Sequence, residues 1–405
     1  MLAVGGTADA QDGADAQSAQ RLFDQFADPG SEFRTKPFMV WNTEITPHRI
    51  DRILSEYKEQ GCGGVFIHPR LGLITEYLSP TWNEMVKYTV DKGRDLGLEV
   101  WLYDENSYPS GFAGGHVPRE MPEAFNRGQG LKPTAADTMP ADVSKYFVIV
   151  AEEDGKFENV TGRAASMAGR PGRFYLYEKT FYQPSPWYAG GPYVDLLAHG
   201  VTDKFMEITM QGYEKTFGGD LKGNVKGVFT DEPEIVSPGG VRWTPDLFDV
   251  FRSEYGYDLS DCLPQLHEEI GDWRKVRHDY FQLLNRLFVE RWARPWYDYC
   301  AGKGISWTGH YWEHNWPLVT GVTDNMSMAA WQQVPGIDML FNQFNEKSTG
   351  AQFGNIRSVK EVRSIANQLG RRRVLSETYG GGGWNVTFKD MKRLCDWQMV
   401  LGVNL

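Results

Sequence analysis

Two glutamates, Glu232 and Glu377, each follow a short apolar run, in VFTDEP (residues 228–233) and LSETY (residues 375–379). Cleavage of a glycosidic bond needs one protonated carboxyl, which donates to the leaving oxygen, and one carboxylate, which activates water or attacks carbon. Buried strands would hold both glutamates at one site, so they are the candidate acid and base. Either alone could instead lie beside a helix cap or in a surface ion pair.

The general acid must keep its proton near neutral pH, so burial or a neighbouring negative charge must raise its pKa. Asp231 and Glu234 lie next to Glu232 and could supply that charge. We therefore assign Glu232 as the acid and Glu377 as the base, with the exchanged roles as the alternative. Carboxyl groups about 6.5–9.5 Å apart would admit a water and invert configuration, whereas about 5–5.5 Å would retain it.

Polar and aromatic residues also follow the other apolar runs, and we predict that they bind the sugar. Ordinary packing is an alternative for His310 and Trp312, and His68 could simply brace the rim. A Gly-rich flap at residues 380–383 could bring Trp384 over the sugar. The candidate binding residues are Trp41, Asn42, His68, Arg70, Asp104, Glu105, Asp231, His310, Trp312, Glu313, Asn342, Tyr379 and Trp384.

The acidic segment 104–106 precedes a turn-rich loop, PSGFAGG, at residues 109–115. Calcium takes about six to eight oxygen ligands from carboxylates, amides and carbonyls. Glu105 is therefore a candidate calcium ligand, and a sugar-binding role for Glu105 is an equal alternative.

His310, Glu313 and His314 are residue types that bind zinc, which makes a metal-dependent amidohydrolase a further alternative. Barrels of that class need an HxH pair after the first strand. Here that position reads Trp-Asn-Thr at residues 41–43, so zinc is disfavoured.

The elements that must position these residues alternate between short apolar runs and helical stretches, which is typical of a parallel sheet. Helices are expected at 49–60, 82–96, 273–303 and 358–369, closed by glycines or led by a capping residue. The sequence contains eight such apolar runs, and eight is the number of strands in a (β/α)₈ TIM barrel. In that fold, polar residues that follow the strands lie on one face. The expected strands are 37–41, 64–68, 99–103, 225–230, 304–308, 337–341, 373–376 and 402–405.

Two insertions and a tail are expected around this barrel. Residues 1–30 predict a disordered tail, and 31–405 predict the catalytic barrel. A small β insertion is expected at about 139–190, between the third and fourth strands, and a helical insertion at about 237–272. The sequence stops inside the eighth expected strand, from which we expect a truncated C-terminus.

Composition excludes some partners. The formal net charge of −11 argues against nucleic acid, which selects a basic surface. No apolar run approaches the roughly 18 residues of a membrane span. The segment at 8–10 (ADA) is like a signal-cleavage site and hints at export.

The motifs together resemble glycoside hydrolase family 106, which contains α-L-rhamnosidases. They are GVFIHPR (64–70), WLYDE (101–105) with PSG (109–111), TDEP (230–233), TGH (308–310) and SETYG (376–380). The resemblance implies inverting, calcium-assisted release of terminal α-L-rhamnose from plant polysaccharide or oligosaccharide. It also implies a periplasmic or extracellular location and further β-sandwich domains after the barrel.

Two other classes stay open at this point. The chain could be another exo-glycosidase on the same barrel, which a panel of aryl glycosides would separate. It could also be a non-catalytic carbohydrate-binding barrel, which would bind sugar without turnover despite Glu232 and Glu377.

Overall fold

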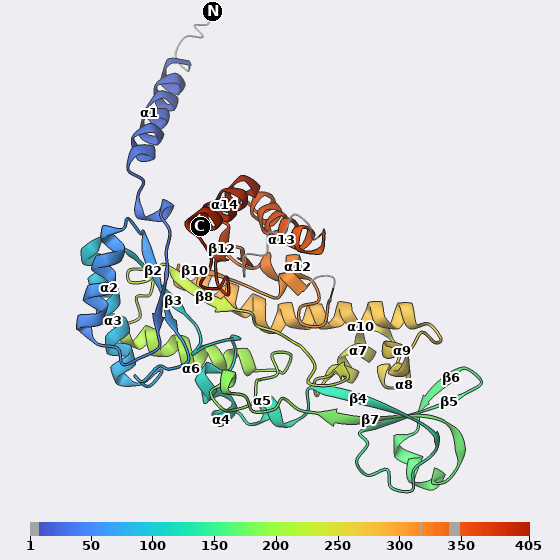
Figure 1. Ribbon diagram of the computed structural model, residues 1–405. Coiled ribbons are helices and arrows are strands. Elements are labelled where there is room, and N and C mark those ends of the chain that lie inside the picture. Colours follow the sequence, from blue (N-terminus) through green and yellow to red (C-terminus); the bar gives the residue numbers. More distant parts are fainter. Residues whose placement is uncertain (1–7, 316–317, 340–348) are drawn as a thin grey trace, which may run out of the picture.

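The computed structural model describes residues 8–315, 318–339 and 349–405 (Figure 1). Two sets of parallel strands form the centre of the fold. One is a five-stranded sheet in the order β1-β2-β3-β8-β10, and the other is the pair β11-β12. The strands are β1 (Phe38–Trp41), β2 (Gly64–Pro69), β3 (Glu99–Tyr103), β8 (Gly227–Asp231), β10 (Ser306–His310), β11 (Gly336–Met339) and β12 (Leu375–Thr378).

These strands have two apolar faces because successive side chains point in opposite directions. One face packs on the helices through residues such as Met39, Ile67 and Val228. The other face forms a separate aromatic-rich cluster to which most of the parallel strands contribute. That cluster contains Phe66, Trp101, Tyr103, Phe229, Val334 and Leu375, with Phe38 and Leu405 packed against it.

Each strand pair is joined through helices, as the sequence predicts. The predicted helices at 49–60, 82–96 and 273–303 are present, and the last is one continuous run with a π-helical turn at its centre. Thr46 and Ser79 cap the first two, and Gly97 and Gly304 end their helices in the left-handed region. The helices are α2 (Pro47–Glu59), α3 (Pro80–Leu96), α6 (Val201–Thr216), α10 (Trp273–Phe288), η5 (Val289–Ala293), α11 (Arg294–Lys303), α12 (Asn325–Ala329), α13 (Thr349–Gln368) and α14 (Phe388–Leu401).

A separate antiparallel sheet lies away from the parallel strands, at the end of the molecule opposite the N-terminal segment (Figure 1). Its order is β6-β5-β7-β4-β9, so its edge strand β9 comes from beyond β8. The strands are β4 (Gly130–Thr138), β5 (Val148–Glu153), β6 (Lys156–Asn159), β7 (Pro171–Thr180) and β9 (Val241–Arg242). Short helices α7 (Leu247–Tyr255), α8 (Leu259–Cys262) and α9 (Pro264–His267) follow β9.

Short helical turns complete the connections between these elements. They are η1 (Ser31–Phe33), η2 (Ala113–Gly115), α4 (His116–Glu120), α5 (Glu123–Asn126), η3 (Thr161–Met167), η4 (Pro186–Tyr188) and η6 (Glu313–Asn315). None of the helices in the described ranges is long and apolar enough to cross a membrane.

The N-terminal segment differs from its prediction. A disordered tail is expected at residues 1–30, whereas the structure has a helix, α1 (Ala8–Ala27), that points away from the rest of the molecule (Figure 1). Alanine and glutamine dominate this segment, and both have high intrinsic helix propensity. The prediction of disorder rests on the low hydrophobicity of this segment. Low hydrophobicity does not prevent a segment from forming a solvent-exposed helix.

The eighth expected strand also differs. Residues 402–405 are not assigned as a strand, because α14 runs to Leu401 and Gly402 closes it. The chain then reaches β12, where Asn404 N and Leu405 N donate to Val374 O and Ser376 N donates to Leu405 O at 3.0 Å. This segment therefore begins a pairing beside β12 without completing a strand.

Candidate active site

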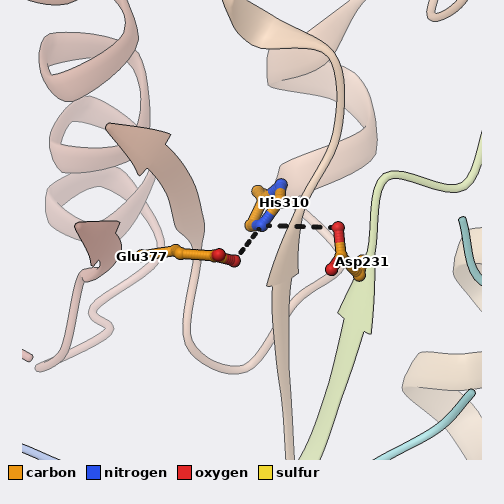
Figure 2. A group of neighbouring side chains, drawn as sticks. All are labelled: Asp231, His310 and Glu377. Atoms are coloured by element: carbon orange, nitrogen blue, oxygen red, sulfur yellow. Dashed lines mark hydrogen bonds and ion pairs between the residues drawn. The ribbon is translucent and has the colours of Figure 1, made fainter. Parts of the chain in front are cut away.

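Three strand ends bring Asp231, His310 and Glu377 together (Figure 2). His310 and Asp231 are paired residues of the neighbouring strands β10 and β8. His310 Nε2 lies 2.8 Å from Glu377 Oε2 and 3.8 Å from Asp231 Oδ1, so the imidazole lies between two carboxylates. The three residues are close because the carboxyl ends of parallel strands meet at one edge.

The charge on His310 follows from these neighbours. Burial alone would lower its pKa, but the hydrogen bond to Glu377 and the charges of Asp231 and Asp338 outweigh burial and raise the pKa well above the usual range. The imidazole is therefore a buried cation that donates to Glu377 and orients its carboxylate.

Glu232 and Asp338 form a second group with His310, in which one ligand atom of each residue lies within 4.8 Å of the others. Burial, followed by the charge of Asp231, raises the pKa of Glu232 well above its usual range. Burial raises the pKa of Asp338 to about 8. Two buried carboxyl groups at this proximity disfavour ionisation of both, which suits Glu232 to the role of an acid.

Glu313 holds the backbone of Asp338 in place through a hydrogen bond. The Asp338 backbone N–H donates to Glu313 Oε1 at 2.5 Å, and Arg357 donates to the Glu313 carbonyl. Burial raises the pKa of Glu313 to about 7. Glu313 therefore positions β11 at the site, and its carboxylate is already engaged.

Asp231 is fixed from the opposite side by the loop after β3. Tyr103 donates to its carboxylate, and Arg70 lies 3.9 Å from Oδ2. Ser110 Oγ accepts from the Asp231 N–H at 2.8 Å, and the Ser110 N–H donates to the Asp231 carbonyl at 2.8 Å. Asp231 is thereby held at both its backbone and its side chain.

Glu105 organises that same loop. Its two carboxylate oxygens are buried and accept hydrogen bonds from backbone N–H groups on both sides of Ser110. Burial raises the pKa of Glu105 to about 8, and the N–H donors oppose this effect. The donors are Asn106, Gly111, Phe112, Ala113 and Gly114.

This arrangement does not fit calcium at Glu105. The carboxylate oxygens face N–H donors, which carry positive partial charge and would repel a cation, whereas calcium needs oxygen ligands. The two groups of described residues close enough to hold a metal both contain His310, whose Nε2 is engaged by Glu377. Calcium therefore stays a prediction from the resemblance.

Several predicted sugar-binding residues are brought to this edge. Arg70, Asp231, His310 and Glu313 border the carboxylates, as described above. His68 is nearby but packs its ring flat on Phe38 at 4.1 Å and edge-on to Tyr103. Burial, and then Arg70, lowers the pKa of His68 well below its usual range, so this ring is neutral.

Other predicted residues lie elsewhere. Trp41 is buried against Trp82 on the helix-covered face of the sheet, because alternation along β1 directs it away from the site. Trp384 is fully exposed, and the Tyr379 hydroxyl donates to the Met391 carbonyl of α14. Asn42 is exposed, Asp104 Oδ1 accepts from Ser110, Trp312 packs beside His314, and Asn342 lies outside the described residues.

Sequence reasoning missed Asp338 and Tyr108. Asp338 is the single charged residue in the apolar strand β11, and a charge at such a position is a usable signal. The sequence pattern instead favours Asn342, after the expected strand 337–341, and Asn342 lies outside the described residues. Tyr108 lies in the loop after β3, and the Arg70 guanidinium is centred 5.0 Å from its ring.

Parallel strands with buried carboxylates and a histidine at their carboxyl ends define an α/β protein with a cluster of ionisable side chains at one edge of its sheet. The family model for glycoside hydrolase family 106, described as α-L-rhamnosidase, matches residues 177–405. The chain belongs to this family, and the match includes Glu232, His310, Asp338 and Glu377.

Solved structures share this fold, and one of them is the rhamnosidase from Novosphingobium sp. PP1Y, with a TM-score of 0.67 and 16% sequence identity. The likeness covers 94% of this chain and 55% of that one, so this chain spans about half the length of the solved relative. A search of the curated proteins gives no match.

Proposed function

We propose that this chain is the catalytic part of an inverting α-L-rhamnosidase that releases terminal α-L-rhamnose from plant polysaccharide or oligosaccharide. The observation that carries the proposal is the cluster in which Glu232 and Glu377 both lie beside the charged His310. Family membership supports the sugar, and the buried carboxyl groups support acid–base chemistry.

In the proposed reaction, protonated Glu232 donates its proton to the glycosidic oxygen while the bond from that oxygen to the anomeric carbon breaks. Glu377 takes a proton from a water molecule, whose oxygen bonds to the anomeric carbon from the opposite face. His310 keeps the Glu377 carboxylate aimed at that water through the 2.8 Å hydrogen bond. Asp231 and Asp338 are placed to accept hydrogen bonds from sugar hydroxyl groups.

Glu232→Gln and Glu377→Gln test the assignment, with Glu153→Gln as a control because that side chain is 81% exposed in the antiparallel sheet. Each site variant is expected to lower rhamnose release by about 10³-fold or more, and the control to leave it unchanged. Proton NMR of the first-formed rhamnose should show the anomer opposite to that of the substrate. Full activity of both site variants would contradict the proposal.

Glu234 is a second candidate for the acid. Burial raises its pKa to about 7, which suits a group that must donate a proton at neutral pH. It lies outside the cluster around His310, which would leave more room for a water beside Glu377. If Glu234→Gln abolishes turnover and Glu232→Gln only weakens it, Glu234 is the acid.

We also propose that the parallel strands close into the (β/α)₈ barrel. The support is the aromatic-rich cluster, which gathers side chains from strands far apart in the sequence together with Phe38 and Leu405. A double-mutant cycle of Phe38→Ala and Leu405→Ala on thermal stability should give a coupling energy of about 0.5 kcal/mol or more if the two ends meet. Additive effects would argue against closure.

A periplasmic or extracellular location and a carbohydrate as the sole macromolecular partner remain proposals that rest on the family resemblance. Cell fractionation with an antibody to this chain tests the location. Recovery in the cytoplasmic fraction alone would contradict it.

A further inference from the structure

A half-exposed aromatic turn lies on the segment that follows β7, outward from the carboxylates. Trp187 belongs to the turn η4, and its side chain is 46% exposed. Its ring packs against Tyr108 with centroids 5.2 Å apart. Trp187 therefore presents one part of its ring to Tyr108 and leaves the remainder to solvent.

A chain of contacts leads from Trp187 to the acid–base cluster. Tyr108 lies under the Arg70 guanidinium at 5.0 Å, and Arg70 lies 3.9 Å from Asp231. Burial and the charges of Glu232 and Asp231 raise the pKa of Tyr108, which is consistent with a position beside these carboxylates. Moving outward from the cluster, the order is Asp231, Arg70, Tyr108 and then Trp187 at the solvent boundary.

The turn that carries Trp187 is held in place before any ligand arrives. Ser185 Oγ accepts from the Trp187 N–H at 3.2 Å, and the Ser185 carbonyl accepts from Tyr188 N and Gly190 N. Tyr182 anchors one end of the segment by donating to Val236 O at 2.6 Å, and Tyr193 anchors the other by donating to Ser110 O at 2.7 Å. A fixed aromatic surface loses little entropy when a ligand stacks on it.

We propose that Trp187 and Tyr108 form a platform for the leaving group of the glycoside, which takes ligands with a flat apolar ring face. This inference rests on the proposed function, because it places the terminal sugar among the carboxylates and the leaving group outside them. Two kinds of leaving group offer such a ring face, namely a pyranose of an oligosaccharide and an aromatic aglycone. Arg70 supports the platform by holding Tyr108 from the inner side.

The test compares three α-L-rhamnosides with the same sugar and different leaving groups, namely ethyl, phenyl and glucosyl. In the purified protein, Trp187→Ala should raise KM about five- to tenfold for the ring-bearing leaving groups and leave KM for the ethyl glycoside unchanged. Reporting each result as the ratio of variant to wild type cancels the different reactivities of the leaving groups. The phenyl and glucosyl arms separate an aromatic preference from a sugar preference.

Phe181→Ala is the matched control, since Phe181 lies on the same segment and is 39% exposed. It should change none of the three KM values, while Trp187→Phe should restore most of the loss. An equal rise for all three substrates, or no rise for any, overturns the platform.

Binding separates this inference from the proposed function. Saturation-transfer NMR with phenyl α-L-rhamnoside should show contact of the phenyl protons with wild-type protein, lost in Trp187→Ala. If the wild type releases no rhamnose but shows this Trp187-dependent contact, the proposed function fails and the platform stands. Phenyl contact that does not depend on Trp187 refutes the platform whatever the turnover.

Discussion

At the scale of single residues, the site depends on one buried cation among several buried carboxyl groups. His310 is the partner of Glu377 and lies near Asp231, Glu232 and Asp338. Removing one member of a buried charge cluster is costly because the others lose their compensation. The histidine is therefore as important to the order of the site as the two glutamates.

His310→Gln is expected to destabilise the protein by about 3 kcal/mol at pH 7, because Asp231 and Glu377 would lose their cation. The loss should be at least as large at pH 5, because a raised pKa of His310 stabilises the folded state most fully below the pKa of an unfolded histidine. Urea unfolding at both pH values measures it. His278→Gln is the control, since His278 is mostly exposed; equal losses for the two variants would contradict the role given to His310.

Glu105→Gln tests the role of Glu105 in organising the loop after β3. A glutamine offers one acceptor oxygen and turns an NH₂ group toward backbone N–H donors, so we expect a loss of about 2–4 kcal/mol in the free energy of unfolding. The exposed Glu84→Gln on α3 should have no effect. A chelator should leave the wild-type melting temperature unchanged if N–H donors alone satisfy Glu105; a large chelator effect would restore the calcium prediction.

The grouping of carboxylates at the strand ends could be predicted from the sequence, because a carboxylate directly after an apolar run is a local pattern. Asp338 could not be predicted in this way, because its role depends on the neighbours that β8 and β10 supply. Glu105 follows β3 as expected, and its proposed calcium stays a prediction. Backbone N–H groups donate to its carboxylate. Because nearly every residue type carries such a group, the sequence does not reveal this interaction.

At the scale of elements, the close approach of β8 and β10 sets the distance between Asp231 and His310. Gly309 makes that approach possible: it has a φ of 130°, and a Cβ there would lie 1.8 Å from Thr230 O. A side chain at this position would push β10 away from β8.

Gly309→Ala is therefore expected to destabilise the protein by more than about 3 kcal/mol and to abolish activity. Gly302→Ala is the matched control, because Gly302 lies in α11 with open space around its Cβ position. That control should be neutral or stabilise by about 0.5–1 kcal/mol through helix propensity. Differential scanning calorimetry measures both; a Gly309→Ala protein with wild-type stability would contradict the account.

Seven of the eight expected strands are present with small changes in their bounds, because buried parallel strands are nearly continuous apolar runs. The eighth is not a strand, because residues 402–405 make only a few backbone hydrogen bonds with Val374 and Ser376 at the start of β12. The edge strand β9 was absent from the prediction. A strand of two residues is too short to show an alternating apolar pattern. Its pairing with β4 is a contact between residues far apart in the sequence, which the local sequence does not show.

At the scale of the whole molecule, buried acidic groups make stability depend on pH. Glu105 and Asp338 have a pKa of about 8, and Glu234 and Glu313 of about 7, with burial as the largest cause of each shift. In the unfolded chain these groups lose their protons near pH 4.5. Between that pH and their folded pKa, the folded state binds more protons, so stability falls as pH rises.

The expected decline is clearest from pH 6.5 to 8.5, since histidines with a lowered pKa, such as His314 at about 4, are neutral throughout. Each group contributes at most about 1.4 kcal/mol per pH unit. Melting temperatures across this range should fall, and Asp338→Asn should flatten the slope while the exposed Asp298→Asn should not. A melting temperature that rises toward pH 8.5 would refute the protonation pattern.

The buried pair of Arg242 and Asp195 fastens the antiparallel sheet to the rest of the molecule. Arg242 also donates to the carbonyls of Gln129 and Trp243, which lie where the chain enters and leaves this sheet. The chain from Gln129 to Asp195 carries β4–β7 and the aromatic turn but not β8, so it can be exchanged as a unit in protein engineering if this clasp is kept. Recombination with related chains at these two points would vary the aromatic turn, and with it the choice of leaving group, over an unaltered acid–base cluster.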